Sequence, residues 1–187
     1  MKNTIKYLIL LIIYLVCGVN LQAQNYTFRN VVMSDGLSGL LVNAIYKDSE
    51  GFVWLGTDNC LDRFDGVKVR HYEFRGVDSG RKKRVNCITE TADNQLWVGN
   101  GIGLWRLNRA NGQLERIVPE KIDFAVNTLL PDGDILYIGT EKGLFIQKDG
   151  QLLQVLTDRN MLAACNRIMD LCLNEDKSAL WLATVQG

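Results

Sequence analysis

The sequence is short of histidine and proline, with one and two residues respectively among 187. A single histidine excludes a histidine-rich metal cage, and neither a Cys-x-x-Cys pair nor a Ser–His pairing stands out. No Ser-rich or Pro-rich tract marks a linker. Lysine plus arginine equal aspartate plus glutamate, at 21 each, so no global field favours an acidic partner. Nucleic-acid binding is therefore not expected.

Long hydrophobic runs are also missing, apart from one near the N-terminus. Lys2 and Lys6 precede an apolar core over residues 7–16, and the small residue Ala23 follows. This order predicts a secretory signal peptide at residues 1–23 and an exported, periplasmic mature chain. The run is shorter than the roughly 20 residues of a comfortable membrane span, and an uncleaved anchor is the alternative. Bulky residues before Cys17 disfavour lipoprotein processing.

A repeat runs through the rest of the chain. An aromatic residue precedes a small one in four copies: Trp54 before Gly56, Trp97 before Gly99, Tyr137 before Gly139 and Trp181 before Ala183. The steps between the aromatics are 43, 40 and 44 residues, the length of a four-stranded propeller blade. An asparagine or aspartate lies ten or eleven residues before each aromatic: Asn43, Asn86, Asn127 and Asp170. Landmarks that recur in register indicate a true repeat.

Short segments rich in β-branched and aromatic residues, such as NAIYKD and FVWLGT, alternate with turn sequences such as DSEG and PDGD. The pattern predicts an all-β fold, a β-propeller of four-stranded antiparallel blades over residues 24–187. The repeats cover approximately residues 40–80, 84–122, 125–160 and 167–187, the last one truncated. We expect an incomplete N-terminal portion of about three and a half blades, with the remaining blades in a longer protein.

The repeated aromatic and glycine positions are expected to be structural. Blades that stack side by side bury the faces of their sheets. A large aromatic on the second strand then fills the gap between sheets, and the glycine two residues on leaves room for the neighbour. This packing role is predicted for Trp54, Gly56, Trp97, Gly99, Tyr137, Gly139 and Trp181.

The first copy, IYKDSEGFVWLGTDNCLDRFDG, resembles the two-component regulator propeller repeat. The matching positions are Ile45, Asp48, Gly51, Trp54, Gly56, Thr57, Leu61, Arg63 and Phe64. The second copy keeps Ile88, Trp97, Gly99, Gly103, Leu104 and Arg106, and the third keeps Gly139, Thr140, Gly143 and Leu144. The segment FRNVVMSDGLS also resembles the one that precedes the first repeat in such proteins.

The resemblance implies a function as well as a fold. Such propellers form the periplasmic sensor region of hybrid two-component histidine kinases in Bacteroides-type bacteria. Many respond to oligosaccharides and regulate glycan-use genes through a phosphorelay. The full-length protein would be tethered to the inner membrane, carry downstream kinase domains and form a homodimer. No kinase motif occurs in this chain, so it is expected to be no enzyme itself and to use no catalytic residue, cofactor or metal.

Two other functions are compatible with the repeat. One is an exported propeller enzyme of the lyase or glycosidase type. The other is a scaffold or adhesion propeller without an attached kinase.

Strand alternation predicts where a ligand or partner binds. With strands a to d in each blade, the b–c turns and the d–a connections emerge on one face, and the longer connections lie there. The candidates on this face are Asp58, Asn59, Arg81, Lys82, Lys83, Arg84, Glu141 and Lys142. The charged run at residues 81–84 could contact an acidic sugar, a phosphate or a partner, but the simpler interpretation is a solvated loop.

Four cysteines follow the predicted signal peptide: Cys60, Cys87, Cys165 and Cys172. Their places in the repeat argue against most disulfide pairings, so free thiols are expected, with Cys87 and Cys172 as small core residues. Cys60 occupies a position that is glycine in the next two copies. If that position needs a left-handed backbone, Asn59 is expected to adopt it instead and to move Cys60 into the strand.

Overall fold

A computed structural model of the chain describes residues 5–7, 27–77, 83–117, 122–155 and 167–185. Two compact units are distinguished, Met1–Asn30 and Val31–Gly187. In the first, residues 5–7 are helical and residues 27–30 have no regular secondary structure. Most of the predicted signal peptide lies outside the described residues. Within the described part, no helix has the length and apolar character that crossing a membrane requires.

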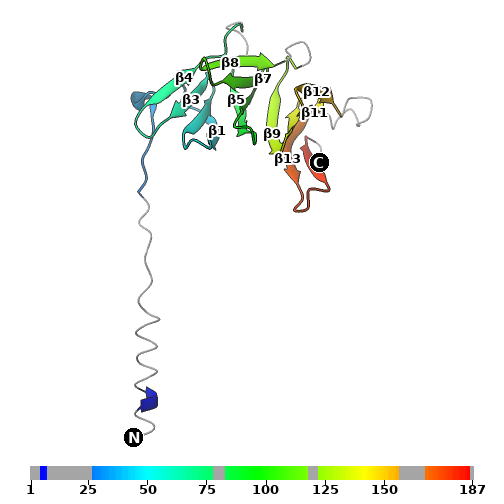
Figure 1. The fold of residues 1–187 in the computed structure, drawn as a ribbon. Coiled ribbons are helices and arrows are strands. Elements are labelled where there is room, and N and C mark those ends of the chain that lie inside the picture. Colours follow the sequence, from blue (N-terminus) through cyan, green and yellow to red (C-terminus); the bar gives the residue numbers. More distant parts are fainter. Residues whose placement is uncertain (1–4, 8–26, 78–82, 118–121, 156–166, 186–187) are drawn as a thin grey trace. The chain divides into compact units, whose positions relative to one another are not determined.

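The second unit begins with a short 3-10 helix, η1 (Met33–Asp35), and continues in antiparallel sheets (Figure 1). The first sheet contains β1 (Val42–Lys47), β2 (Val53–Thr57), β3 (Leu61–Phe64) and β4 (Val69–Tyr72). The second contains β5 (Val85–Glu90), β6 (Leu96–Asn100), β7 (Gly103–Asn108) and β8 (Gln113–Ile117). The third contains β9 (Val126–Asp132), β10 (Ile135–Thr140), β11 (Gly143–Lys148) and β12 (Gln151–Gln154). A two-stranded sheet of β13 (Ile168–Leu173) and β14 (Leu180–Thr184) follows.

Each sheet is a meander in which every strand pairs with the next one along the chain. The first strands of successive sheets, β1, β5, β9 and β13, lie next to one another (Figure 1). Sheets arranged through their first strands are propeller blades, with strand a innermost and strand d outermost. The predicted all-β fold of four-stranded antiparallel blades is therefore confirmed.

Asp48 organises the first a–b hairpin. Its Oδ1 atom accepts hydrogen bonds from the backbone N–H groups of Glu50 (3.1 Å) and Phe52 (2.9 Å). Its Oδ2 atom accepts one from Nε1 of Trp54 at 2.7 Å. In the second blade Thr91 has the corresponding position, and its Oγ1 accepts the Nε1 hydrogen bond of Trp97 at 3.1 Å. The repeat therefore ties the hairpin to the aromatic that fills the core.

The glycines two residues after the aromatics allow neighbouring blades to approach closely. A Cβ atom on Gly56 would lie 2.4 Å from Cγ1 of Val85, the first residue of the next blade. The same overlap would occur at 2.6 Å between Gly99 and Val126, and at 2.7 Å between Gly139 and Ile168. Since a real Cβ does not approach other atoms so closely, any side chain here would push two blades apart.

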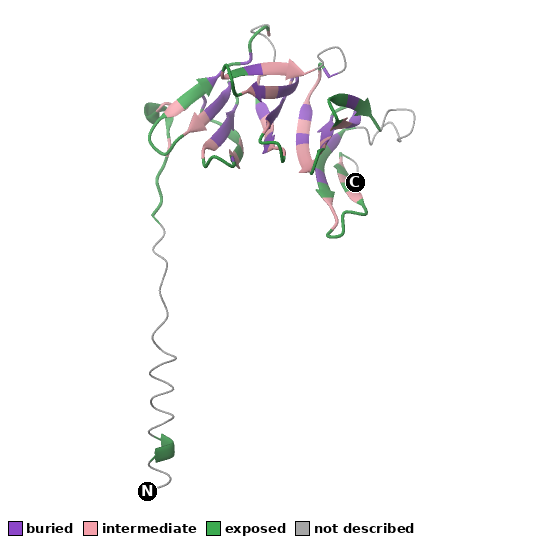
Figure 2. Ribbon diagram, in the orientation of Figure 1, coloured by how far each residue is buried: buried purple, intermediate pink, exposed green. Residues whose placement is uncertain are grey.

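The core lies between the blades, where the buried segments of adjacent sheets face each other (Figure 2). Trp54 is fully buried and packs with Trp105 and Phe74 in the cluster between the first two blades. Trp97 is buried between the second and third blades, and Tyr137 is partly buried against the fourth sheet. The predicted packing role is wrong for Trp181, which is 67% exposed. No sheet covers its side of β14 among the described residues.

The repeated asparagines bridge successive blades. Nδ2 of Asn86 donates to the carbonyl oxygen of Val126 at 2.9 Å, and Nδ2 of Asn127 donates to that of Ile168 at 2.7 Å. In both cases an amide on one innermost strand satisfies a carbonyl at the start of the next. Such bonds fix the spacing of the inner strands, because a buried carbonyl without a partner is costly.

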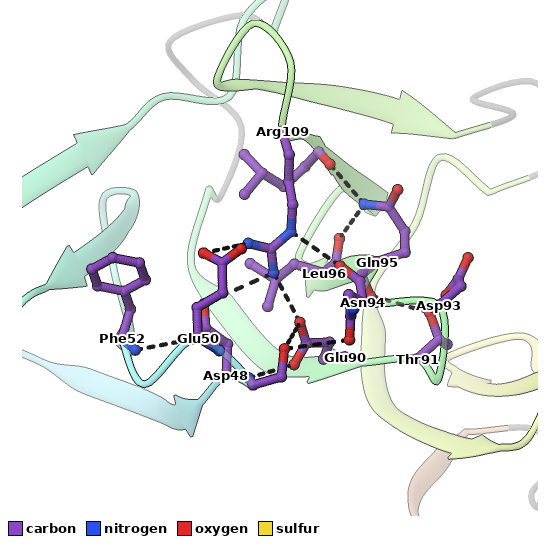
Figure 3. A network of polar contacts seen from close by, with 12 residues as sticks. Asp48, Glu50, Phe52, Glu90, Thr91, Asp93, Asn94, Gln95, Leu96 and Arg109 are labelled. Atoms are coloured by element: carbon purple, nitrogen blue, oxygen red, sulfur yellow. Dashed lines mark hydrogen bonds and ion pairs between the residues drawn. The ribbon is translucent and has the colours of Figure 1, made fainter.

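Arg109 bridges the first two blades at their a–b hairpins (Figure 3). Its guanidinium reaches Oε1 of Glu90 (2.8 Å) and Oε2 of Glu50 (3.0 Å), and its Nε donates to the carbonyl oxygen of Asn94 (3.0 Å). Backbone N–H and Oγ of Ser49 also donate to Glu90, at 2.8 and 3.0 Å. One arginine thus holds carboxylates from two sheets.

Candidate functional site

The b–c turn of the first blade, residues 58–60, is held by the side chain of Thr57. Its Oγ1 accepts hydrogen bonds from the backbone N–H groups of Asn59 (3.2 Å) and Cys60 (3.0 Å), and donates to the carbonyl oxygen of Cys60 (2.9 Å). Thr140 holds the third blade's turn in the same way, donating to the carbonyl of Gly143 at 2.7 Å. The threonine of the repeat is therefore a turn-forming residue.

The expectation that Asn59 takes a left-handed backbone is wrong. Gly103 and Gly143, in the position of Cys60, have φ of 148° and 116°. The described non-glycine residues with positive φ are Asn94, Asp149 and Lys177, so neither Asn59 nor Cys60 is among them. Cys60 also lies one residue before β3 rather than within it. The Thr57 side chain and a bond from Nδ2 of Asn59 to the carbonyl of Ser38 (2.8 Å) support a different turn.

A buried carboxylate lies directly behind this turn. Asp62 has a fully buried side chain and accepts four hydrogen bonds. Oδ2 receives the backbone N–H and the Oγ of Ser38, both at 2.8 Å. Oδ1 receives Sγ of Cys60 at 3.3 Å and pairs with Nδ1 of His71 at 2.7 Å. The segment before the first strand is thus fastened to the third strand of the blade.

Sequence reasoning missed Asp62, although the repeat contains a signal for it. The second and third blades place Trp105 and Phe145 at this position, where they pack on Phe74 (5.0 Å) and Phe124 (6.0 Å). A carboxylate at a position where the other blades have an aromatic residue indicates that this position has a different function or packs against a different neighbour. Here the neighbour is Ser38, a polar residue, rather than the aromatic of a preceding blade.

Burial governs the chemistry of the Cys60 thiol. It raises the thiol pKa to about 12, with the hydrogen bond from Ser38 opposing the rise and the negative charge of Asp62 adding to it. The Cys87 thiol, packed beside Val126, also has its pKa raised to about 12 by burial. Both groups are protonated at neutral pH and are poor nucleophiles.

The described cysteines are free thiols, as predicted, but the predicted core role of Cys172 is wrong. Cys87 packs against the core cluster between the second and third blades. Cys172 is exposed, because the sheet that carries it has an uncovered face among the described residues. Cys165 lies outside those residues.

These differences predict the order of thiol labelling. With iodoacetamide at about pH 8, we expect Cys172 to be alkylated in the native protein, and Cys60 and Cys87 at least about tenfold more slowly. Peptide mapping by mass spectrometry of native and unfolded samples gives the rates. Equal labelling of all three thiols in the native protein would contradict the buried placement.

The remaining predicted residues lie on separate blades. The carbonyl of Arg84 accepts from Gly101 in the second blade's b–c turn (3.2 Å), and the N–H of Glu141 donates to Ala125 (3.1 Å). The ammonium of Lys142 lies 4.5 Å from the centre of the Phe124 ring. Lys83 is partly buried, whereas Arg81 and Lys82 lie outside the described residues. Each b–c turn is therefore joined to the connection that leads into its own blade.

Two polar pockets lie between blades. One, of about 330 Å³, lies between β4 and the β7–β8 hairpin and is lined by Arg70, His71, Tyr72, Glu73, Arg75, Asn111 and Gln113 among others. The other, of about 300 Å³, lies between the second and third blades beside Trp97, Asp134 and Lys148. Both have the size of a small-ligand site.

Comparisons with known proteins agree with this architecture. The extracellular domain of BT4673 from B. thetaiotaomicron, named as a hybrid two component system, superposes with a TM-score of 0.66 at 21% identity over 80% of this chain and 21% of that one. PorZ, a surface component of the type-IX secretion system of Porphyromonas gingivalis, superposes with a TM-score of 0.67 at 17% identity over 89% of this chain and 28% of that one. The fold is thus that of a β-propeller.

The sequence comparisons concern parts of the chain. Residues 36–59 match the family model of the two component regulator propeller, so the chain carries a two-component regulator propeller repeat, as predicted. Histidine kinase P4 of Formosa agariphila is 32% identical over 79 residues, which make up 42% of this chain and 6% of the kinase. The chain therefore spans a small fraction of the relatives that it matches.

Proposed function

We propose that the chain is the ligand-recognition propeller of an exported sensor of the two-component type, and that its ligand is an oligosaccharide. The match of residues 36–59 to the two component regulator propeller carries the proposal. The similarity to a histidine kinase supports it. Ligand binding by this chain would control a kinase domain elsewhere in the full-length protein and, through it, the transcription of glycan-use genes. The protein would be held at the inner membrane and act as a homodimer.

The pocket between β4 and β8 supports a sugar ligand. Asn111 and Gln113 offer amide donors and acceptors, and Arg70 lies 5.1 Å from the centre of the Tyr72 ring. Neither Arg70 nor Arg75 has an acidic partner within ion-pair distance among the described residues. Planar donors of this kind bind carboxylate or sulfate groups in a bidentate manner. Since these two arginines outnumber the one carboxylate of the lining, Glu73, the pocket favours oligosaccharides that carry acidic substituents over neutral ones.

Calorimetric titration of the chain with neutral and acidic oligosaccharides tests this function. We expect binding of an acidic member, and a loss of affinity of about tenfold or more for Arg70→Ala and Gln113→Ala. Lys148→Ala, in the pocket between the second and third blades, is the matched control and should leave that affinity unchanged. A complete panel without heat would contradict the proposal. Cleavage of the added oligosaccharide, detected by mass spectrometry, would instead indicate the lyase or glycosidase alternative.

A further inference from the structure

Three metal-ligating atoms of different chemistry converge behind the first b–c turn. They are Sγ of Cys60, Oδ1 of Asp62 and Nδ1 of His71, and all lie within 4.8 Å of one another. Sγ and Nδ1 each form a hydrogen bond with Oδ1, at 3.3 Å and 2.7 Å respectively. Thiolate, carboxylate and imidazole are the ligands that zinc takes in proteins.

The surrounding structure already holds these atoms in place. Ser38 binds the other carboxylate oxygen of Asp62 twice, so that Oδ1 faces Cys60 and His71. Thr57 binds the backbone N–H of Cys60 and fixes the turn on which the thiol sits. His71 is paired with Asp62 across β3 and β4, and its side chain is 47% exposed. Two ligands are therefore buried and rigid, and the third lies where an ion can enter.

We propose that Cys60, Asp62 and His71 form a binding site for a divalent zinc-like ion, with water in the remaining coordination position. The ion would replace the hydrogens that now join Sγ and Nδ1 to Oδ1. The thiol gives up its proton to solvent and binds as thiolate. The imidazole binds through the Nδ1 lone pair and, staying neutral, carries its hydrogen on Nε2. One proton leaves for each ion bound.

Charge balance favours this occupant. A thiolate beside the buried Asp62 carboxylate would place two negative charges away from water. A divalent cation between them makes the group neutral, which removes that penalty. The site also explains a cysteine in a position that is glycine in the next two blades, since a glycine there would leave only two ligands. His71 also lines the oligosaccharide pocket, whereas Cys60 and Asp62 do not, so Cys60→Ala tests the metal site without changing that lining.

Titration of the full chain with Co²⁺ tests the site, because thiolate ligation produces a charge-transfer band in the near ultraviolet. We expect saturation at one ion per chain, displacement by Zn²⁺, and release of about one proton per ion in calorimetry with buffers of different ionisation enthalpy. His71→Gln should weaken binding about tenfold or more, and Cys60→Ala should abolish the band.

Cys172→Ala is the matched control, since Cys172 is an exposed thiol outside the cluster. It should keep the band and the stoichiometry. Far-ultraviolet circular dichroism of Cys60→Ala and His71→Gln separates loss of a ligand from loss of the fold. A wild-type chain without the band would overturn the proposal, as would a band that disappears with Cys172 and survives Cys60→Ala.

Discussion

Replacing Trp54 with alanine is expected to lower the free energy of unfolding by about 3–5 kcal/mol, the range for large aromatic side chains removed from a core. Trp54 is fully buried between the first two blades, and its ring centre lies 5.1 Å from that of Tyr72. The change also removes the Nε1 hydrogen bond to Asp48, whose side chain is fully buried. Denaturant unfolding followed by far-ultraviolet circular dichroism gives the difference.

Trp181→Ala is the matched control because it changes the same position of the repeat. Trp181 is 67% exposed, so its loss should alter the free energy of unfolding by no more than about 0.5 kcal/mol. Trp54→Phe keeps most of the apolar surface and removes the hydrogen bond. Its loss in free energy of unfolding should therefore lie between those of Trp54→Ala and Trp181→Ala. Equal losses for Trp54→Ala and Trp181→Ala would mean that the described packing does not determine stability.

Replacing Arg109 with methionine is expected to lower the free energy of unfolding by about 2–3 kcal/mol. Removing one partner of a buried ion pair leaves an uncompensated charge, and the cost is reduced here because Arg109 keeps 30% of its side chain exposed. The side chains of Glu90 and Asp48 are buried, and among the described residues Arg109 is the one arginine in ion-pair contact with them. The free energy of unfolding should fall, and the difference between variant and wild type should shrink in high salt.

Arg106→Met tests whether any surface arginine has the same effect. Arg106 pairs with Glu115 at 3.3 Å, and both side chains are well exposed. Exposed pairs contribute roughly 0–1 kcal/mol, so this variant should be close to wild type. If Arg106→Met were as costly as Arg109→Met, burial of the carboxylates in the Arg109 network would not be the reason for its effect.

The blade architecture could be predicted from the sequence because it depends on local pattern. The repeat of Trp54, Trp97 and Tyr137 locates each second strand, and turn sequences locate the hairpins. The role of the glycine could also be predicted locally, because a residue two positions after the aromatic lies on the same face of the strand. These features are present in each copy and need no knowledge of distant residues.

The Asp62 cluster could not be predicted in this way. Ser38, Asp62 and His71 belong to three segments, and only pairing of β3 with β4 and docking of the chain before β1 bring them together. The bridge from Arg109 to Glu50 likewise joins two blades through side chains that no short motif relates. Position in the repeat predicted burial for Trp181 and Cys172, and both are exposed.

By itself, then, the sequence determined that this chain forms antiparallel blades and which positions can pack against a neighbouring blade, because strand periodicity and turn chemistry act over a few residues. Only the tertiary structure decided which of those positions are covered, and which polar side chains meet. Burial requires a neighbouring sheet, and a carboxylate can be buried as Asp62 is only where folding supplies donors from elsewhere in the chain.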